Sequence, residues 1–209
     1  MNRQIAFLDF DGTITTKDTL LEMIKFSKGS FRFYLGFLIN SPWLLAWKAG
    51  IISNQRAKER MLTWFFGGMQ LDAFQDTCNR FAATAIPNLI RPKAIHEVRL
   101  LQEKGVEVVI VSASPANWLQ PWTDQLGTAL LATRLETRNH PHNPQPGAPV
   151  TTRLTGKILD RNCHGEEKVC RIRESYDLSA YDNILAYGDS SGDKPMLALA
   201  NHAFFKPFR

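Results

Sequence analysis

The sequence predicts an α/β fold in which a doubly wound, parallel-sheet core carries an all-helical insertion directly after its first strand. Three observations lead to this prediction. A short apolar run, Ile5–Leu8, is typical of a buried strand and stops at two closely spaced carboxylates. Residues 16–84 then show helical patterning without a convincing strand. From Pro87 onward, expected strands and helices alternate, as they do when helices cover both faces of a parallel sheet.

The composition is that of a globular protein with one core domain and a smaller insertion. Its 209 residues are 44% hydrophobic and 22% charged, which is enough apolar material for a sizeable core. Three scattered Cys are too few for a disulfide framework, and the first residues lack the apolar run of a signal peptide, so we expect a cytoplasmic protein. The net charge of +5 mildly favours an anionic ligand, and we expect no nucleic-acid partner.

Five helices are expected within the insertion. They are Leu20–Ser27, Phe31–Ile39, Pro42–Gly50, Asn54–Phe66 and Leu71–Ala83. Pro42 is placed in the first turn of the third helix, and Gly67-Gly68 separates the last two. Asp18 precedes the first helix, where it either caps that helix or turns its carboxylate toward the site described below.

The middle of the insertion is unusually apolar. Residues 33–47 carry no charge and include five aromatic side chains. The run is too short for a confident membrane-spanning helix, and Asn40-Ser41-Pro42 is expected to break it. It is either a helical hairpin buried inside the insertion or an interfacial patch that touches a bilayer or a lipid substrate. In the second case the flanking cations would face the membrane surface; they are Lys25, Lys28, Arg32 and Lys48.

The remainder of the chain supplies the alternating elements of the core. The expected strands are Val106–Val111, Ala129–Glu136, Val150–Leu159, Asn183–Tyr187 and Ala203–Lys206. The expected helices are Pro92–Lys104, Pro115–Leu126, Glu166–Tyr176 and Pro195–Ala200. The Pro-rich stretch His140–Pro149 is typical of a surface loop, placed between the arms of a hairpin.

Two carboxylates mark the end of the first strand. Asp9 and Asp11 are two residues apart, so they share one face if the strand persists that far. The carboxyl end of a central parallel strand opens onto the ligand crevice of such sheets. Two adjacent anions there would repel one another unless a cation or a shared proton intervened. Taken alone, the pattern is equally consistent with a strand that ends in an Asp-Gly turn.

Three further polar signals follow in order along the chain. Ser112 ends the β-branched run before Pro115, Lys168 lies early in a helix, and Asp189 and Asp193 follow the strand Asn183–Tyr187. Each has a simpler explanation, such as a helix cap or a solvated lysine. Together they form an ordered set of carboxylates, a hydroxyl and a lysine. Carboxylate oxygens suit Mg²⁺, and a lysine and a hydroxyl complete a cage for a phosphoryl group.

This ordered set resembles the haloacid dehalogenase (HAD) superfamily. The string Asp9-Phe10-Asp11-Gly12-Thr13 matches the first family motif, Ser112 the second, Lys168 the third, and Asp189 with Asp193 the fourth. The resemblance implies a Rossmann-like, doubly wound core made of residues 1–15 and 85–209, with a helical cap made of residues 16–84. The place of the cap is similar to that in the subclass that includes phosphoserine phosphatase.

The resemblance also implies roles for these residues. Asp9 would be the nucleophile that becomes a phospho-aspartate, and Asp11 would protonate the leaving oxygen and then activate water. Mg²⁺ would be held by Asp9, the backbone carbonyl of Asp11 and Asp189, with support from Asp193. Ser112 would bind a phosphoryl oxygen, and Lys168 would neutralise charge. The implied substrate-binding residues are Thr13, Asp18, Arg56, Lys58 and Ala113.

The substrate follows less closely from the resemblance. Phosphoserine phosphatases carry a Glu where this chain has Asp18, a Ser-Gly where it has Ser112-Ala113, and an Asn that Gly188–Asp193 lacks. The apolar run is more similar to that of a bacterial phosphatidylglycerophosphate phosphatase. The leading expectation is a small organic phosphate enclosed under the cap. The alternatives are a lipid phosphate monoester docked against residues 33–47, with peripheral membrane contact, and a non-catalytic binding module.

A zinc site is disfavoured. Cys163, His164 and Cys170 fall within eight residues, but they lack the paired Cys-x-x-Cys spacing of structural zinc sites. We expect both cysteines to be ordinary thiols.

Overall fold

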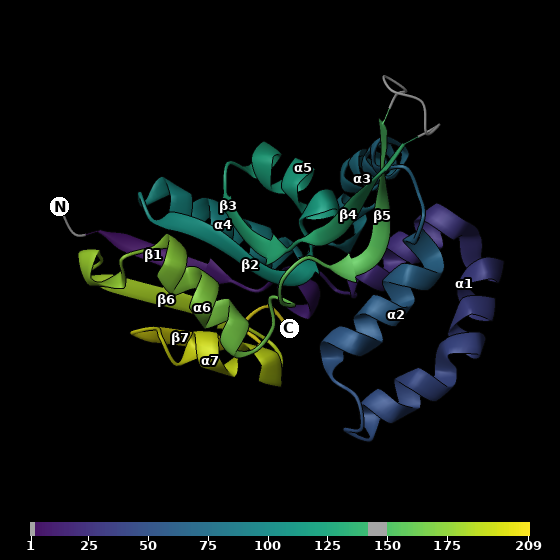
Figure 1. Ribbon diagram of the computed structural model, residues 1–209. Helices are drawn as coiled ribbons and strands as arrows, with labels where there is room; N and C mark the ends of the chain where they lie inside the picture. The colour runs from purple at the N-terminus through teal and green to yellow at the C-terminus, as the bar shows by residue number, and fades with distance from the viewer. Residues whose placement is uncertain (1–2, 142–149) are drawn as a thin grey trace.

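A computed structural model describes residues 3–141 and 150–209, and its centre is a five-stranded parallel sheet (Figure 1). The strand order is β3-β2-β1-β6-β7. The strands are β1 (Gln4–Leu8), β2 (Glu107–Pro115), β3 (Ala129–Thr133), β6 (Asn183–Gly188) and β7 (His202–Phe205). All four neighbouring pairs run parallel. The chain begins in the middle of the sheet and winds outward in both directions, which confirms the predicted doubly wound α/β core.

Helices cover both faces of this sheet. They are α4 (Pro92–Glu103), α5 (Ala116–Leu126), α6 (Glu166–Ser175) and α7 (Lys194–Leu197). Successive side chains of β1 alternate between two hydrophobic clusters, as the pleat of a strand requires. Ala6 and Leu8 pack with residues of α4 and α5, whereas Ile5 and Phe7 pack with residues of α6 and α7. Short helical turns complete the core; they are η1 (Phe10–Ile14), η2 (Ile86–Leu89), η3 (Leu178–Ala180) and η4 (Ser191–Asp193).

Three helices, which we call the cap, lie beyond the carboxyl end of β1 (Figure 1). They are α1 (Thr19–Lys48), α2 (Asn54–Phe66) and α3 (Leu71–Thr84). The chain leaves and re-enters the core at adjacent points, because Thr15 and Ile90 form an isolated antiparallel bridge. The predicted division into core and cap remains a prediction.

The expected break at Pro42 is wrong. Helix α1 runs through this residue, and its one kink lies at Gly29, whose φ of 78° is accessible mainly to glycine. Proline removes the N–H that would bond to the carbonyl four residues earlier, here that of Leu38. The Ser41 hydroxyl donates to this same carbonyl at 2.7 Å. The side chain before the proline therefore supplies the missing donor, and the helix continues.

The apolar run 33–47 is not a buried hairpin. Phe33, Gly36 and Asn40 are buried on the side of α1 that faces α2. Much of the rest of the run is open to solvent, and its exposed side chains are Tyr34, Leu35, Leu38, Ile39, Trp43, Leu45 and Trp47. No helix among the described residues is long and apolar enough to cross a membrane.

A two-stranded antiparallel sheet packs against α2. It consists of β4 (Leu135–Pro141) and β5 (Val150–Ile158), so the expected strand 129–136 is in fact divided at Arg134. Leu154 of β5 exchanges backbone hydrogen bonds with Gly68 and Met69, which follow α2. The hairpin of β4 and β5 therefore packs against the cap. Most of the expected loop His140–Pro149 lies outside the described residues.

Candidate active site

The candidate catalytic residues meet at the carboxyl ends of β1, β2 and β6. Asp9 directly follows β1, and its backbone N–H donates to the carbonyl of Tyr187 on β6 at 2.9 Å. The next turn brings Gly12, with a φ of 83°, against the loop after β6. A Cβ atom on Gly12 would lie 2.7 Å from Asp189 Oδ2. Glycine is therefore required here both by the backbone conformation and by the close approach of the Asp189 side chain.

Lys168 is the centre of a buried ion-pair network. Its ammonium donates to Asp9 Oδ1 at 2.6 Å, to Asp193 Oδ1 at 2.8 Å and to the carbonyl of Val111 at 2.7 Å. All three ammonium protons are thereby used, and the residue is 1% exposed. Burial alone would lower the pKa of Lys168, but the two carboxylates raise it above its ordinary value. Lys168 is charged and fixed, rather than a solvated surface lysine.

Asp9 is a buried carboxylate with two further carboxylates, Asp11 and Asp193, close to it. Its Oδ2 accepts a hydrogen bond from the Thr13 hydroxyl at 2.9 Å. Burial raises the pKa of Asp9 to about 7 although Lys168 opposes this, and Asp193 and Asp11 raise it further. One lysine does not balance three neighbouring carboxylates. This excess negative charge is what a divalent cation would neutralise.

Asp193 is held by the turn that carries it. Its Oδ2 accepts from the backbone N–H groups of Asp189 and Ser190 and from the Ser190 hydroxyl, at 3.1, 2.9 and 2.8 Å. Although burial opposes the shift, Lys168 lowers the pKa of Asp193 below its ordinary value. Because both carboxylate oxygens already have protein donors, Asp193 is suited to orienting the loop and Lys168.

The carboxylates of Asp9, Asp189 and Asp193 form a cluster that fits a hard cation. One oxygen from each lies within 4.8 Å of the others, and no other such group of His, Cys, Asp or Glu occurs in the described part of the chain. Asp189 also forms an ion pair with Arg209. Oxygen donors of this kind match the preference of Mg²⁺. Asp9 and Asp189 are therefore the side chains suited to hold it.

Both carboxylate oxygens of Asp11 accept hydrogen bonds, from two residues that sequence reasoning did not place in the site. Its Oδ1 accepts from the backbone N–H of Thr19 at 2.6 Å, and its Oδ2 accepts from the Ser114 hydroxyl at 2.6 Å. Ser112 lies farther from the same oxygen, at 3.4 Å. Ser114 stands in Ser112-Ala113-Ser114-Pro115, just before a helix, where a serine is equally typical of a helix cap. Thr19 contributes its backbone N–H, a group that every residue except proline has, so the residue type gives no signal for this contact.

A cavity of about 670 Å³ lies above these residues, between the sheet and the cap. Asp9, Asp11, Lys168 and Asp193 line its polar end. Helices α1 and α2 supply its apolar wall, which consists of Leu20, Leu21, Phe37, Leu44, Leu45, Trp47, Ala57 and Met61. The site thus combines a charged floor with a largely hydrophobic roof.

The chain is similar to known proteins. A family model described as haloacid dehalogenase-like hydrolase matches residues 6–198. The chain belongs to this family. It is 33% identical over 208 residues to protein CicA of Caulobacter vibrioides, a match that covers 98% of this chain and 86% of CicA. The predicted membership of the HAD superfamily is confirmed, and with it the expectation of a hydrolase.

Solved structures share the HAD fold. A Bordetella pertussis protein of unknown function superimposes with a TM-score of 0.79 at 20% identity, covering 97% of this chain and 89% of that one. A phospho-aspartyl intermediate analogue of phosphoserine phosphatase superimposes with a TM-score of 0.65 at 14% identity, covering 97% and 86%. At these identities the likeness establishes the fold alone.

The HAD structure brings some expected substrate-binding residues to the cavity and leaves others away from it. Asp18 lines the cavity and also caps α1, accepting from the Leu21 N–H at 3.1 Å. Burial and the neighbouring Asp11 raise its pKa to about 6. Thr13 contacts Asp9, as described above, and is not among the lining residues. Arg56 is exposed and likewise outside the described lining of the cavity.

Lys58 is a cation of the cavity wall, as is Lys48. Its ammonium donates to the carbonyl of Ala113 at 2.9 Å and to Asn162 Oδ1 at 3.2 Å. Burial lowers its pKa, while Asp18 and Asp11 oppose the shift. Lys58 and Ala113 therefore reach the site together, one from α2 and the other from the end of β2.

His164 lines the cavity, which sequence reasoning did not predict. Sequence reasoning considered it only as a zinc ligand, whereas it lines the cavity beside Lys168. Its ring lies so close to Gly192 that a Cβ atom there would be 2.3 Å from Nε2. Cys163 is buried, and burial raises the pKa of its thiol to about 11, while Cys170 is exposed.

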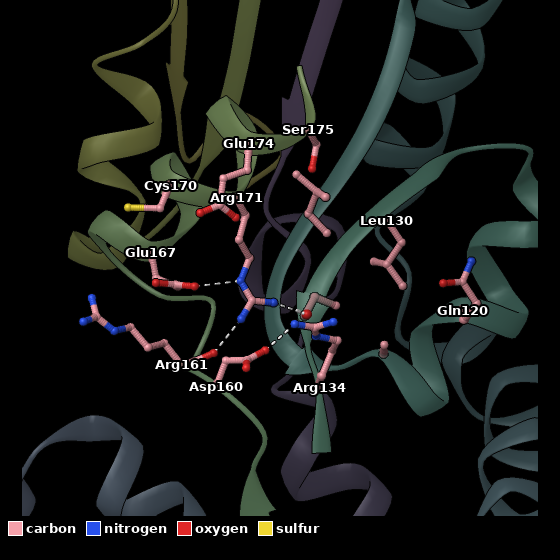
Figure 2. Close-up of a pocket in the computed structure, with 13 residues that line it drawn as sticks. Gln120, Leu130, Arg134, Asp160, Arg161, Glu167, Cys170, Arg171, Glu174 and Ser175 are labelled. Atoms are coloured by element: carbon pink, nitrogen blue, oxygen red, sulfur yellow. Dashed lines mark hydrogen bonds and ion pairs between the residues drawn. The ribbon is translucent and has the colours of Figure 1, made fainter. Parts of the chain in front are cut away.

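A second cavity, also of about 670 Å³, lies beside β3 and α6, away from the catalytic groups (Figure 2). Its charges pair internally. Arg171 donates to Glu167 at 3.0 Å and to the carbonyls of Ala132 and Arg161, and Arg134 forms an ion pair with Asp160. This pairing leaves little unbalanced charge for an ionic ligand.

Proposed function

We propose that this hydrolase is a Mg²⁺-dependent phosphomonoesterase that acts on a small organic phosphate through a phospho-aspartate at Asp9. The observation that carries the proposal is the fixed pair of Asp9 and Lys168, with Asp11 two residues away, at the floor of the cavity under the cap. A buried carboxylate held 2.6 Å from an ammonium is oriented to attack, and the charge around it suits phosphoryl transfer.

The reaction proceeds in two displacements. Asp9 attacks phosphorus and the ester P–O bond breaks, while Asp11 gives its proton to the departing alcohol oxygen. Water then attacks the phospho-aspartate and gives a proton to Asp11, and the bond between phosphorus and the Asp9 oxygen breaks to release phosphate. Lys168 offsets the negative charge of the phosphoryl group through its own positive charge, and the Ser112 hydroxyl donates to a phosphoryl oxygen. Mg²⁺ would be held by Asp9 and Asp189 with the backbone carbonyl of Asp11, and it would neutralise charge on the phosphoryl group.

A second substrate class has a specific observation in its favour. The roof of the cavity is largely apolar, and the solvent-facing side of α1 continues this apolar surface outward. A lipid phosphate monoester would place its headgroup at Asp9 and its chain along residues 33–47. Under this alternative the protein works in the cytoplasm with peripheral membrane contact.

The test is phosphate release from a panel of monoesters, with Mg²⁺ or with a chelator. The panel comprises phosphoserine, sugar phosphates, nucleotides, lysophosphatidate and phosphatidylglycerophosphate. We expect metal-dependent release that Asp9→Asn lowers about a thousandfold or more, with an exposed-site variant such as Lys157→Met as the control. Release from no member by folded, metal-bound protein would contradict the proposal and favour a non-catalytic binding module.

A further inference from the structure

We propose that Trp118, Thr19 and Ser114 form a hydrogen-bond relay that positions Asp11 for proton transfer to the leaving oxygen. The inference rests on the proposed function, in which Asp11 is the acid and base. The three residues come from different elements: Trp118 from α5, Thr19 from the start of α1, and Ser114 from the end of β2. None of them was assigned a role by the sequence motifs.

The relay has one direction. Trp118 Nε1 donates to Thr19 Oγ1 at 3.2 Å, and an indole N–H is only a donor. The Ser114 hydroxyl donates to Asp11 Oδ2 at 2.6 Å. The hydroxyls of Thr19 and Ser114 are 3.0 Å apart. Since Ser114 uses its proton on Asp11, Thr19 must donate to Ser114, and each hydroxyl has one definite orientation.

The same threonine holds the other side of the carboxylate. The Thr19 backbone N–H donates to Asp11 Oδ1 at 2.6 Å, in the first turn of α1. Asp11 is therefore bound at both oxygens, and its carboxylate plane is set by the cap helix and by the end of β2. Ser114, rather than Ser112 at 3.4 Å, makes the close side-chain contact.

Burial makes the relay rigid. Trp118 and Thr19 are 0% exposed and Ser114 is 2% exposed. In such surroundings successive hydrogen bonds polarise one another, and water is not at hand to replace a lost partner. Proton transfer requires an acid placed to within a fraction of an ångström. Loss of any relay hydroxyl or of the indole N–H should loosen Asp11 while leaving the cavity in place.

The test uses two substrates that differ in their need for an acid. An alkyl phosphate loses a poor leaving group that must be protonated, whereas 4-nitrophenyl phosphate loses a stabilised phenolate that needs little protonation. The comparison uses kcat/KM, which reports the steps up to formation of the phospho-aspartate and leaves out its hydrolysis, a step common to both substrates. For Ser114→Ala, Thr19→Val and Trp118→Phe we expect kcat/KM on the alkyl phosphate to fall roughly tenfold to a hundredfold, a part of the contribution of general acid catalysis. On 4-nitrophenyl phosphate kcat/KM should stay within about threefold of wild type.

Matched variants separate positioning from a general structural effect. Thr19→Ser keeps the hydroxyl and should retain activity on both substrates. Trp122→Phe alters a second buried indole on α5, which packs on Phe10 and has no hydrogen-bond partner among the described residues, and should not discriminate between the substrates. In an Asp11→Asn background, Ser114→Ala should add almost nothing, because residues that act through one another are not additive.

Three outcomes would overturn the relay while the wild type remains active. These are equal losses on both substrates, a Thr19→Ser variant as impaired as Thr19→Val, and a full additional loss in the Asp11→Asn background. A wild type that hydrolyses neither substrate would instead contradict the proposed function, and the relay with it.

Discussion

Lys168 holds together two carboxylates that would otherwise repel one another in a buried site. Its ammonium contacts Asp9 and Asp193 and is 1% exposed, so no solvent replaces it when it is removed. We expect Lys168→Met to lower the free energy of unfolding of the metal-free protein by about 3 kcal/mol or more, because it leaves buried charge unpaired. Urea unfolding at pH 8 measures this. Lys168→Met combined with Asp193→Asn should recover part of the loss, and no recovery would contradict the account.

Asp9 makes the stability of the metal-free protein depend on pH. Burial raises its pKa from 3.8 to about 7, so the folded state holds this proton more tightly than the unfolded state does. The associated stabilisation is present below pH 4 and is lost as the pH rises through 7. Asp9→Asn does not titrate. The unfolding free energy of wild type should therefore fall relative to that of Asp9→Asn between pH 4 and 8, by an amount on the order of a few kcal/mol. An unchanged difference over this range would show that Asp9 is ionised throughout.

Helix α1 shows where sequence reasoning succeeded and where it did not. Its helical character and the cap at Asp18 were predictable from patterning. The continuity through Pro42 was not, because it depends on the Ser41 hydroxyl reaching the Leu38 carbonyl. The motif residues Asp9, Asp11, Lys168 and Asp193 were predictable because strand ends converge in a parallel sheet. Ser114 and Thr19 were not, since their contacts with Asp11 depend on how the cap helix meets β2.

The contact between α1 and α2 depends on Gly36. A Cβ atom there would lie 2.2 Å from Cζ of Phe65. In an open helix Gly→Ala would stabilise by up to about 1 kcal/mol. We expect Gly36→Ala to destabilise instead, by about 1–3 kcal/mol, because Phe65 must leave its packed position. The thermal unfolding midpoint gives the sign. Leu38→Ala on the exposed side of the same helix is the control, and a Gly36→Ala protein more stable than wild type would refute the packing argument.

At the scale of the whole molecule, the cap presents an apolar surface to solvent. Leu38 is 71% exposed and Leu45 is 66% exposed, with cations such as Arg32 and Lys48 at either end of the run. Apolar surface flanked by basic residues suits an anionic bilayer surface. If residues 33–47 make peripheral membrane contact, flotation with vesicles of anionic phospholipid should recover the wild type. Leu38→Glu with Leu45→Glu should abolish recovery.

Phe205→Glu is the matched control for that experiment. This side chain is also exposed, but it belongs to the edge strand β7 of the central sheet and not to the cap. Its recovery should equal that of wild type. If the wild type does not float, the apolar side of α1 is no membrane contact and the small organic phosphate is favoured as the substrate.

The phospho-aspartate at Asp9 is the central claim, and trapping it tests the account most directly. Asp11→Asn should still form the intermediate from 4-nitrophenyl phosphate, whose leaving group needs little protonation, but should hydrolyse it slowly because the base is gone. Acid quenching followed by peptide mass spectrometry should find one added phosphoryl group on the peptide that contains Asp9, and none when Asp9→Asn is also present. Turnover of 4-nitrophenyl phosphate with the phosphoryl group on another residue, or on none, would contradict the account.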